Sequence, residues 1–317
     1  MQESSGADRV SILLAVRNGA AFLDAQLESF AAQQHTDWQL LASDDGSTDE
    51  SPRLLAEFAA RLQASGRPVR CIGGPCAGGP ANFLGLLAQA PDLPWTALSD
   101  QDDVWMPDRL SRGIAALRAL PHGTPALYCS ATTVVDETLE NPRPSRRVPR
   151  PPGFRNALLQ NIASGNTILL NRAAARLART AAPAAAGVPG LAAHDWWLYQ
   201  LVSGAGGTVI YDATPTLYYR QHGQNQIGAN HGLHAGMSRF RMLLGGRLQR
   251  WNTANIAALR AAHTQLTPEN RALSEAFAAL REQAFLPRLR GFARLRLYRQ
   301  SPIAQAAIWL AVALGRI

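Results

Sequence analysis

Short apolar runs alternate with amphipathic stretches through the first hundred residues. Strands are predicted at Val10–Val16, Gln39–Ser43, Val69–Ile72 and Trp95–Ser99, with helices between them near Ala20–Gln34, Asp49–Ala64 and Ala81–Ala90. Apolar runs separated by helical periods are typical of βαβ units, in which helices cover a parallel sheet. The pattern therefore predicts an α/β fold of Rossmann-like type, with a mostly parallel sheet and flanking helices.

The second half of the chain is less regular. A further helix is expected from Pro107 to about Leu120, because proline is favoured in the first turn. Strand-like segments recur at Ala126–Val135, Thr167–Leu170, Thr208–Tyr211 and Thr216–Arg220. The stretch Asn141–Gly153, with five prolines and four arginines, is expected to be a loop over one face. From about Asn230 the pattern is helical only. We therefore expect a catalytic domain over residues 1–228 and a helical C-terminal extension over 229–317.

The basic charge of the chain is concentrated in this extension. The sequence has a net charge of +8, 31 arginines and no lysine, a usage typical of a GC-rich genome. An isolated arginine is therefore weak evidence for phosphate binding. Residues 230–317 hold 13 arginines and three glutamates, a balance of +10. A local surface of this kind favours an anionic partner such as a membrane leaflet, and we expect no nucleic-acid partner.

The cysteines and the N-terminal residues argue against a secreted, disulfide-rich or zinc-binding protein. Cys71, Cys76 and Cys129 are too few, and wrongly spaced, for a disulfide framework or a zinc site. Met1–Arg9 is polar and mildly acidic, unlike a signal peptide. The apolar run Val10–Val16 is too short to span a bilayer. The catalytic part is therefore expected in the cytoplasm.

Polar motifs follow three of the predicted strands. They occupy residues 15–19 (AVRNG), 43–49 (SDDGSTD) and 99–105 (SDQDDVW). Because the carboxyl ends of parallel strands share one edge of a sheet, five carboxylates are expected to converge there. These are Asp44, Asp45, Asp100, Asp102 and Asp103. Such crowding is costly unless a cation compensates it, and carboxylate and phosphate oxygens suit Mg²⁺ or Mn²⁺. The motifs therefore predict a divalent cation that bridges a diphosphate.

Each motif also has a plainer interpretation. Asp45-Gly46 is a good turn, and Ser47 with Glu50 matches a capping box. Residues 100–103 could partly cap the helix after Pro107. Three such motifs at strand ends together favour a binding site. The glycine-rich segment 73–80 lacks a following Gly-Lys-Ser/Thr, so it is no Walker loop, and it is either a plain connection or a nucleotide contact.

Taken in order, the motifs resemble those of the family 2 glycosyltransferases, which have the GT-A fold. The matching segments are 10–15 with Asn18-Gly19, 43–49, Gly78 with Asn82-Phe83, 99–105, Asn161 with 165–167, 194–197 (HDWW) and 219–225 (YRQHGQN). They extend over about residues 10–228. The forms Ser-Asp-Gln-Asp-Asp-x-Trp, His-Asp-Trp-Trp and Tyr-Arg-Gln-His-Gly are most similar to bacterial rhamnosyltransferases of surface polysaccharide assembly.

The resemblance implies roles for individual residues. Asp195 corresponds to the catalytic base, although a carboxylate at a helix N-terminus is also favoured by the helix dipole. The nucleotide sugar would be bound by Ala15, Arg17, Asp44, Asp45, Asn82, Asp100, Gln101 and Arg220. The metal would be bound by Asp102 and by His222, unless His222 packs in its loop. Trp196 and Trp197 would stack on the acceptor, unless they pack in the core.

One position departs from the family pattern. Arg17 stands where a tyrosine is usual. Stacking on the base would then be by a guanidinium, or the base selectivity would change.

The resemblance implies an inverting, metal-dependent transfer from a dTDP- or UDP-sugar, with L-rhamnose from dTDP-rhamnose as the first candidate. The acceptor would be a saccharide or a lipid-linked saccharide. A carboxylate takes the proton of the attacking hydroxyl, and the metal neutralises the leaving diphosphate. Two alternatives are a sugar-phosphate nucleotidyltransferase and a non-enzymatic basic binding protein. The first would typically have a basic glycine-rich loop where residues 15–19 stand, and the second leaves the aspartates unexplained.

The end of the chain suggests a peripheral membrane anchor. Arg288, Arg290, Arg294, Arg296 and Arg299 alternate with Leu289, Phe292, Leu295 and Leu297. The following segment Pro302–Leu314 has no charge and contains Trp309. It is too short to span a membrane but suits an interfacial helix beside anionic lipid on the inner face of the cell membrane. An amphipathic helix packed on the catalytic domain is the alternative.

Overall fold

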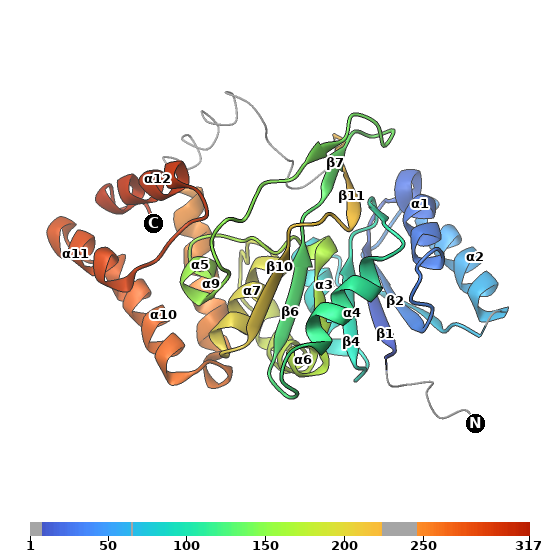
Figure 1. The fold of residues 1–317 in the computed structure, drawn as a ribbon, viewed down its shortest axis with the longest axis horizontal. Helices are drawn as coiled ribbons and strands as arrows, with labels where there is room; N and C mark the ends of the chain where they lie inside the picture. The colour runs from blue at the N-terminus through green and yellow to red at the C-terminus, as the bar shows by residue number, and fades with distance from the viewer. Residues whose placement is uncertain (1–7, 65, 224–245) are drawn as a thin grey trace.

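The structure is a computed structural model, and it describes residues 8–64, 66–223 and 246–317. A seven-stranded sheet with the order β10-β6-β9-β4-β1-β2-β3 forms its centre (Figure 1). The strands are β1 (Val10–Val16), β2 (Trp38–Asp44), β3 (Val69–Gly73), β4 (Trp95–Ser99), β6 (Ala126–Ser130), β9 (Leu169–Asn171) and β10 (Thr208–Asp212). Neighbouring strands are parallel except β9, which is antiparallel to β4 and β6. The predicted mostly parallel α/β sheet is confirmed.

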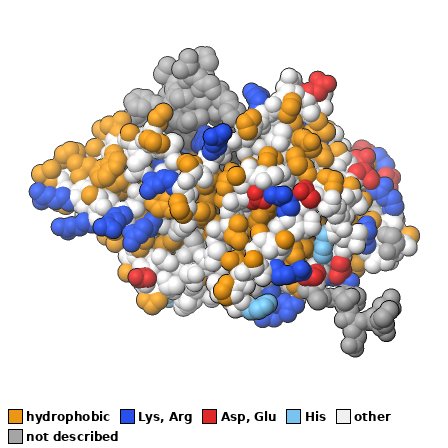
Figure 2. Space-filling model, viewed as in Figure 1, with side chains coloured by type: hydrophobic (Ala, Val, Ile, Leu, Met, Phe, Trp, Pro, Cys, Tyr) orange, Lys and Arg blue, Asp and Glu red, His pale blue; other side chains and the backbone are white. Residues whose placement is uncertain are grey.

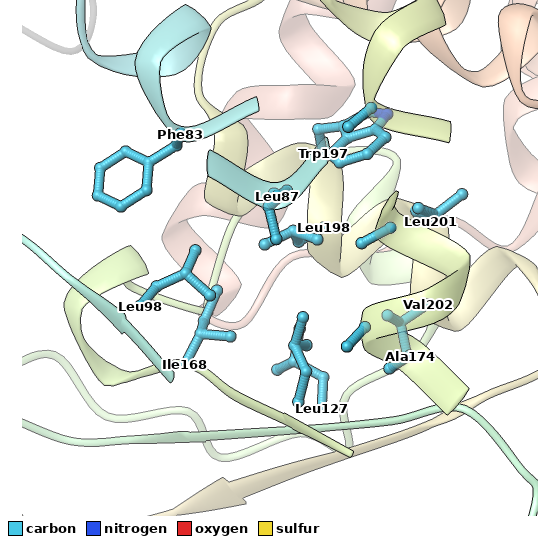
Figure 3. Close-up of a cluster of buried hydrophobic side chains, with 14 of the residues drawn as sticks. Phe83, Leu87, Leu98, Leu127, Ile168, Ala174, Trp197, Leu198, Leu201 and Val202 are labelled. Carbon is cyan, nitrogen blue, oxygen red and sulfur yellow. The ribbon is translucent and has the colours of Figure 1, made fainter. Parts of the chain in front are cut away.

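Helices cover both faces of this sheet because side chains alternate along each strand. One face is covered by α3 (Gly79–Gln89), α6 (Arg172–Ala186) and α7 (His194–Gly204). The other is covered by α1 (Ala20–Ala31), α2 (Ser51–Ala64) and α4 (Arg109–Arg118). On the first face, Leu98 and Leu127 of the sheet lie opposite Leu87 of α3 and Leu198 of α7 (Figure 3). Two apolar layers therefore hold the strands so that their carboxyl ends remain at one edge.

A small second sheet lies over that edge. It has the order β5-β11-β7-β8, from β5 (Val104–Trp105), β7 (Thr133–Val135), β8 (Arg143–Pro144) and β11 (Leu217–Arg220). The single strand expected over residues 126–135 is thus two strands in different sheets, and the loop expected over 141–153 contains β8. Pairing of β5 with β11 brings the end of β11 beside the loop that follows β4.

Most other boundaries differ from the prediction by one to three residues. The helix expected from Pro107 begins at Arg109. The strand expected at 167–170 begins at Leu169, because Gly165–Thr167 forms the 3-10 helix η1.

The C-terminal extension is helical over its described residues, as predicted. It contains α9 (Arg247–Ala261), η2 (His263–Gln265), α10 (Pro268–Leu280), α11 (Phe285–Leu295) and α12 (Pro302–Ala313). These helices lie at the end of the molecule opposite α1 and α2 (Figure 1). They share a third hydrophobic core with Trp196 and with Phe154 of α5 (Phe154–Ala157). The expected boundary at residue 228 lies outside the described residues. In the described ranges, no helix has the length and apolarity of a membrane span.

Candidate active site

The loops that follow β1 and β2 are joined by side-chain hydrogen bonds. The backbone N–H of Asn18 donates to Ser47 Oγ at 2.9 Å, and the Ser47 hydroxyl donates to Asp44. Ser47 therefore does not form the suggested capping box with Glu50. Helix α2 begins later, at Ser51, whose N–H donates to the carboxylate of Asp49 at 3.0 Å. The motif after β2 thus serves to fix the turn after β1.

Asp45 anchors the glycine-rich loop. Its side chain is buried and accepts hydrogen bonds from the N–H groups of Cys76 at 2.6 Å and Gly78 at 3.0 Å. A Cβ atom at Gly74 would lie 2.7 Å from Asp45 Oδ1, so the loop can approach this closely only with glycine there. Asp45 therefore has a structural role in this loop, and its contact with a nucleotide stays a prediction.

We expect Asp45→Asn to lower the free energy of unfolding by about 1.5–3 kcal/mol, since an amide nitrogen cannot accept one of these two bonds. Chemical denaturation would measure this loss. The matched control is Asp24→Asn, an exposed aspartate on α1, which should change stability by less than about 0.5 kcal/mol. Equal effects of the two substitutions would show that the loop does not depend on Asp45.

Gln101 ties the loop after β4 to the end of β1. Its Nε2 donates to the carbonyl of Arg17 at 3.0 Å, and its Oε1 accepts from the Arg17 N–H at 2.7 Å. A Cβ atom at Gly19 would lie 2.4 Å from Gln101 Oε1. The Arg17 side chain is 54% exposed, with Nη1 3.5 Å from Asp45 Oδ2. Gln101 therefore positions Arg17 at the open edge, and its own contact with the nucleotide stays a prediction.

Asn82 and Ala15 lie on the inner side of the same edge. Asn82 is buried in α3, where its Oδ1 accepts from Ser43 Oγ at 2.5 Å and its Nδ2 donates to the Ser43 carbonyl at 3.2 Å. Ala15 pairs with Ser43 across β1 and β2. Both residues therefore contact Ser43 near the carboxyl end of β2, and they help to fix that end of the strand.

The loop after β4 crowds carboxylates together. Asp103 is fully buried, accepts from the Arg220 N–H at 3.2 Å, and accepts from the Asn166 side-chain amide. Burial raises the pKa of Asp103 well above its ordinary value, and the charges of Asp102 and Asp100 add to the effect. Burial also raises the pKa of Asp100 to about 8, with further contributions from Asp102 and Asp195.

The five strand-end carboxylates thus form two groups rather than one. Asp44 and Asp45 are bonded to Ser47 and the glycine-rich loop. The acidic loop after β4 is instead linked to Asp195 through η1, where the Asn166 side-chain amide donates to Asp103 and the Gly165 N–H donates to Asp195.

The segment after β11 closes over Asp102. His222 Nε2 lies 2.8 Å from Asp102 Oδ2, and both side chains are largely buried. The Arg220 guanidinium donates to the Asp102 carbonyl at 3.0 Å and to the Glu137 carbonyl. Phe22 of α1 contacts both, with ring centroids 4.6 Å apart for His222 and the guanidinium carbon of Arg220 4.8 Å from the ring centre. Phe22 was not among the predicted site residues, because in the sequence it resembles any helix residue that faces the protein.

This pair fits a divalent cation. A carboxylate oxygen and an imidazole nitrogen are accepted as ligands by such ions, and a cation would relieve the repulsion around Asp100 and Asp103. Within the described ranges, no three His, Cys, Asp or Glu side chains form a metal-binding group. Among the described residues, Asp102 and His222 are the pair that could hold a cation.

Asp195 lies in the first turn of α7. One carboxylate oxygen accepts from the Trp196 N–H at 2.6 Å and the other from the Gly165 N–H at 3.0 Å. Burial raises the pKa of Asp195 to about 6, although these bonds and one from Asn161 act in the opposite direction. The bonds fix the orientation of a carboxylate whose pKa suits a general base near neutral pH. Asn161 and Gly165 were part of the matched motifs, but no role was assigned to them.

The residues on either side of Asp195 are packed inside the protein. Trp197 is fully buried in the core between the sheet and its helices (Figure 3), and Trp196 is 6% exposed with Nε1 donating to the Ala157 carbonyl at 2.7 Å. The expected acceptor contact is thus replaced by core packing. The ring of His194 stacks on that of Phe83, with centroids 3.7 Å apart, and burial lowers the pKa of His194 to about 3.

Comparison with known proteins assigns the chain to a family. The glycosyl transferase family 2 profile matches residues 11–176, just over half of the chain. The chain belongs to glycosyltransferase family 2. The protein is therefore a glycosyltransferase, and the matched range contains Arg17, Asp45 and Asp102. Asp195 and His222 lie beyond the matched range.

Individual relatives are distant. The chain is 25% identical over 228 residues to the dTDP-rhamnosyl transferase RfbG of Shigella flexneri, covering 68% of this chain and 74% of that protein. It is 26% identical over 217 residues to an uncharacterized protein of Mycobacterium tuberculosis, covering 67% of this chain and 59% of that one.

Solved structures agree on the fold. S. aureus TarS 1–349 superposes with a TM-score of 0.55 at 14% identity, covering 97% of this chain and 79% of that one. The complex of TarS 1–349 with UDP superposes with a TM-score of 0.53 at 14% identity, covering 97% of this chain and 80% of that one. The chain spans 45% of a longer TarS chain. At this identity the similarity concerns the GT-A fold.

Proposed function

We propose that this glycosyltransferase is inverting and metal-dependent, and that it takes its sugar from a nucleoside diphosphate donor. The observation that carries the proposal is that η1 joins Asp195 to the acidic loop: the Gly165 N–H donates to Asp195 at 3.0 Å, and the Asn166 side-chain amide donates to Asp103. L-Rhamnose from dTDP-rhamnose is the first candidate donor, supported by the similarity to RfbG, and the UDP complex of TarS supports a pyrimidine nucleotide. The acceptor is a saccharide or a lipid-linked saccharide.

The nucleotide end of the donor is assigned to the loops after β1 and β2. Arg17 is held by Gln101 through its backbone while its guanidinium remains half exposed. A planar guanidinium held in this way can stack on a pyrimidine ring. Asp45 keeps the glycine-rich loop beside it. These residues would therefore fix the base and ribose before the diphosphate reaches the acidic loop.

The diphosphate end is assigned to Asp102 and the segment after β11. A divalent cation bound there supplies neutralisation of the charge on the leaving diphosphate. Asp102 and His222 would hold it. Arg220 keeps the segment in place through its bonds to the Asp102 and Glu137 carbonyls.

The acceptor hydroxyl is assigned to Asp195. As the hydroxyl oxygen attacks the anomeric carbon, its proton passes to an Asp195 oxygen, and the bond from that carbon to the diphosphate oxygen breaks. The N–H groups of Gly165 and Trp196 keep the carboxylate oriented during this transfer. Attack from the face opposite the leaving group inverts the anomeric centre.

Hydrolysis of purified dTDP-, UDP- and GDP-sugars, with and without Mn²⁺, tests the function. We expect slow hydrolysis that requires Mn²⁺ and is fastest with dTDP-rhamnose. Chelation by EDTA should remove it. Formation of a nucleotide sugar from a nucleoside triphosphate and a sugar phosphate would instead establish a nucleotidyltransferase. Equal hydrolysis of all donors without metal would contradict both the donor and the metal assignment.

A further inference from the structure

Large exposed apolar side chains gather on the last two helices. Of the eight such residues in the described part of the chain, six lie between residues 285 and 314. They are Phe285, Leu286, Ile303, Trp309, Leu310 and Leu314. We call this set the terminal apolar surface. Figure 2 shows hydrophobic side chains covering this end of the molecule.

Helix α12 is apolar on both of its faces. Ile308 and Val312 are buried in the third core, whereas Ile303 and Leu310 are 84% and 45% exposed. A helix on the surface of a soluble domain normally presents polar residues to water. Residues 302–314 contain no charged side chain. A contiguous apolar face of this kind marks an interaction site.

The apolar residues of α11 and of the segment that follows it have a different role from the one the sequence suggested. Phe292 and Leu297 are buried in the third core, and Leu289 and Leu295 pack against it. These side chains attach the extension to the catalytic domain, as in the packed alternative. They are not available to a membrane, so the exposed apolar face comes mainly from α12 and the start of α11.

The same region is basic and lacks acidic residues. Residues 283–317 hold six arginines and no aspartate or glutamate. Arg288 donates to the carbonyls of Val312 at 2.6 Å and Ala313 at 3.1 Å, which fixes α12 against α11. Arg290 and Arg294 are exposed on α11. In Figure 2, basic side chains line the edge of the apolar surface, a combination that complements anionic lipid.

We infer that the terminal apolar surface docks on an anionic membrane. Helix α12 has 12 residues and is therefore about 18 Å long, too short for a hydrocarbon core of about 30 Å. It would lie in the interface, with Ile303 and Leu310 below the headgroups and Trp309 at their level. Arg290 and Arg294 would contact the lipid phosphates. This inference goes beyond the proposed function and does not depend on it.

Flotation of the full-length protein with vesicles tests the apolar part. With phosphatidylcholine vesicles containing phosphatidylglycerol, Leu310→Asp should lower the partition coefficient by at least about tenfold, since it removes a leucine that would insert into the membrane and adds a negative charge. The matched control is Leu139→Asp, because Leu139 is 39% exposed elsewhere and its φ of 67° is tolerated by aspartate. This control should bind as the wild type does. Thermal melting of each variant checks the fold.

The charged part is tested in the same assay. Arg290→Gln with Arg294→Gln should weaken binding about fivefold for each arginine removed, and added salt should weaken it further. The control is Arg70→Gln, an exposed arginine on the edge strand β3. Binding to phosphatidylcholine alone should be weak.

Three results would overturn the inference. They are no flotation of the wild type, equal flotation of wild type and Leu310→Asp, and flotation that does not depend on phosphatidylglycerol. Light scattering measures the oligomeric state and so tests the other possible occupant of the surface, a second copy of this chain. A dimer that Leu310→Asp converts to a monomer without loss of vesicle binding would assign the surface to self-association.

Discussion

Asp195→Asn should lower the rate of sugar transfer by about a hundred- to ten-thousand-fold, because the amide cannot accept the proton of the acceptor hydroxyl. Donor nucleotide affinity should change little, since Asp195 lies in α7 and not on the strand ends after β1 and β2. One of the bonds from Gly165 and Trp196 is also lost, so the melting temperature should be measured beside the rate. Single-turnover kinetics and nucleotide titration provide the two readouts.

The pH dependence of the wild type gives an independent test. Burial raises the pKa of Asp195 to about 6, and a base must be ionised to act. The value of kcat/KM should therefore fall about tenfold for each pH unit below 6, and this limb should be absent in Asp195→Asn.

Asp108→Asn is the matched control, because Asp108 also precedes a helix but lies outside the site. It should keep the full rate. Near-normal turnover of Asp195→Asn would mean that another residue is the base. Loss of nucleotide binding in that variant would place Asp195 in the donor site.

Asp102→Asn should abolish the metal-dependent tightening of nucleoside diphosphate binding. Loss of a residue that only hydrogen-bonds to a metal ligand can weaken metal affinity by up to roughly a hundred-fold. Loss of the carboxylate ligand itself should weaken it by at least this much. Calorimetry of dTDP or UDP binding, with Mn²⁺ and with EDTA, measures this effect. Nucleotide binding without metal should be unchanged, because Arg17 and the glycine-rich loop are not altered.

A second variant separates a metal ligand from a structural hydrogen bond. If His222 shares the cation with Asp102, His222→Asn should weaken Mn²⁺-dependent binding in the same direction. If the 2.8 Å contact between them only closes the segment after β11, His222→Asn should affect metal-free and metal-bound states equally. An Asp102→Asn variant with unchanged Mn²⁺ dependence would remove Asp102 from the metal ligands.

The position of the site could be predicted from the sequence because strand ends are marked by abrupt changes from apolar to polar residues. The predicted bounds of β1 and β4 agree with the structure at both ends. Fully buried parallel strands need continuous apolar runs, so a polar motif can only follow where the strand leaves the core. The motifs of Arg17 and Asp102 were therefore placed on the correct edge.

The partners of the polar side chains could not be predicted in the same way. Gln101 bonds to the Arg17 backbone and Asp45 to the glycine-rich loop, and both pairings depend on loop conformations that no periodicity encodes. Trp196 and Trp197 flank the site in sequence but point into two different cores. A sequence motif shows which residues are present. The direction of each side chain depends on how the helix that the motif begins packs in the fold.

The third core gives the C-terminal helices a part in the geometry of catalysis. Trp196 directly follows the proposed base, and its indole meets Trp251 of α9 edge to face, in the same core as Phe277 and Phe292 of α10 and α11. We therefore expect the first turn of α7 and the extension to unfold as one cooperative unit. Amide hydrogens of that turn should exchange at the rate set by opening of α10 and α11. A deletion of the last helices would then displace the proposed base, so the effect of the deletion on turnover could not be ascribed to lost attachment at a surface.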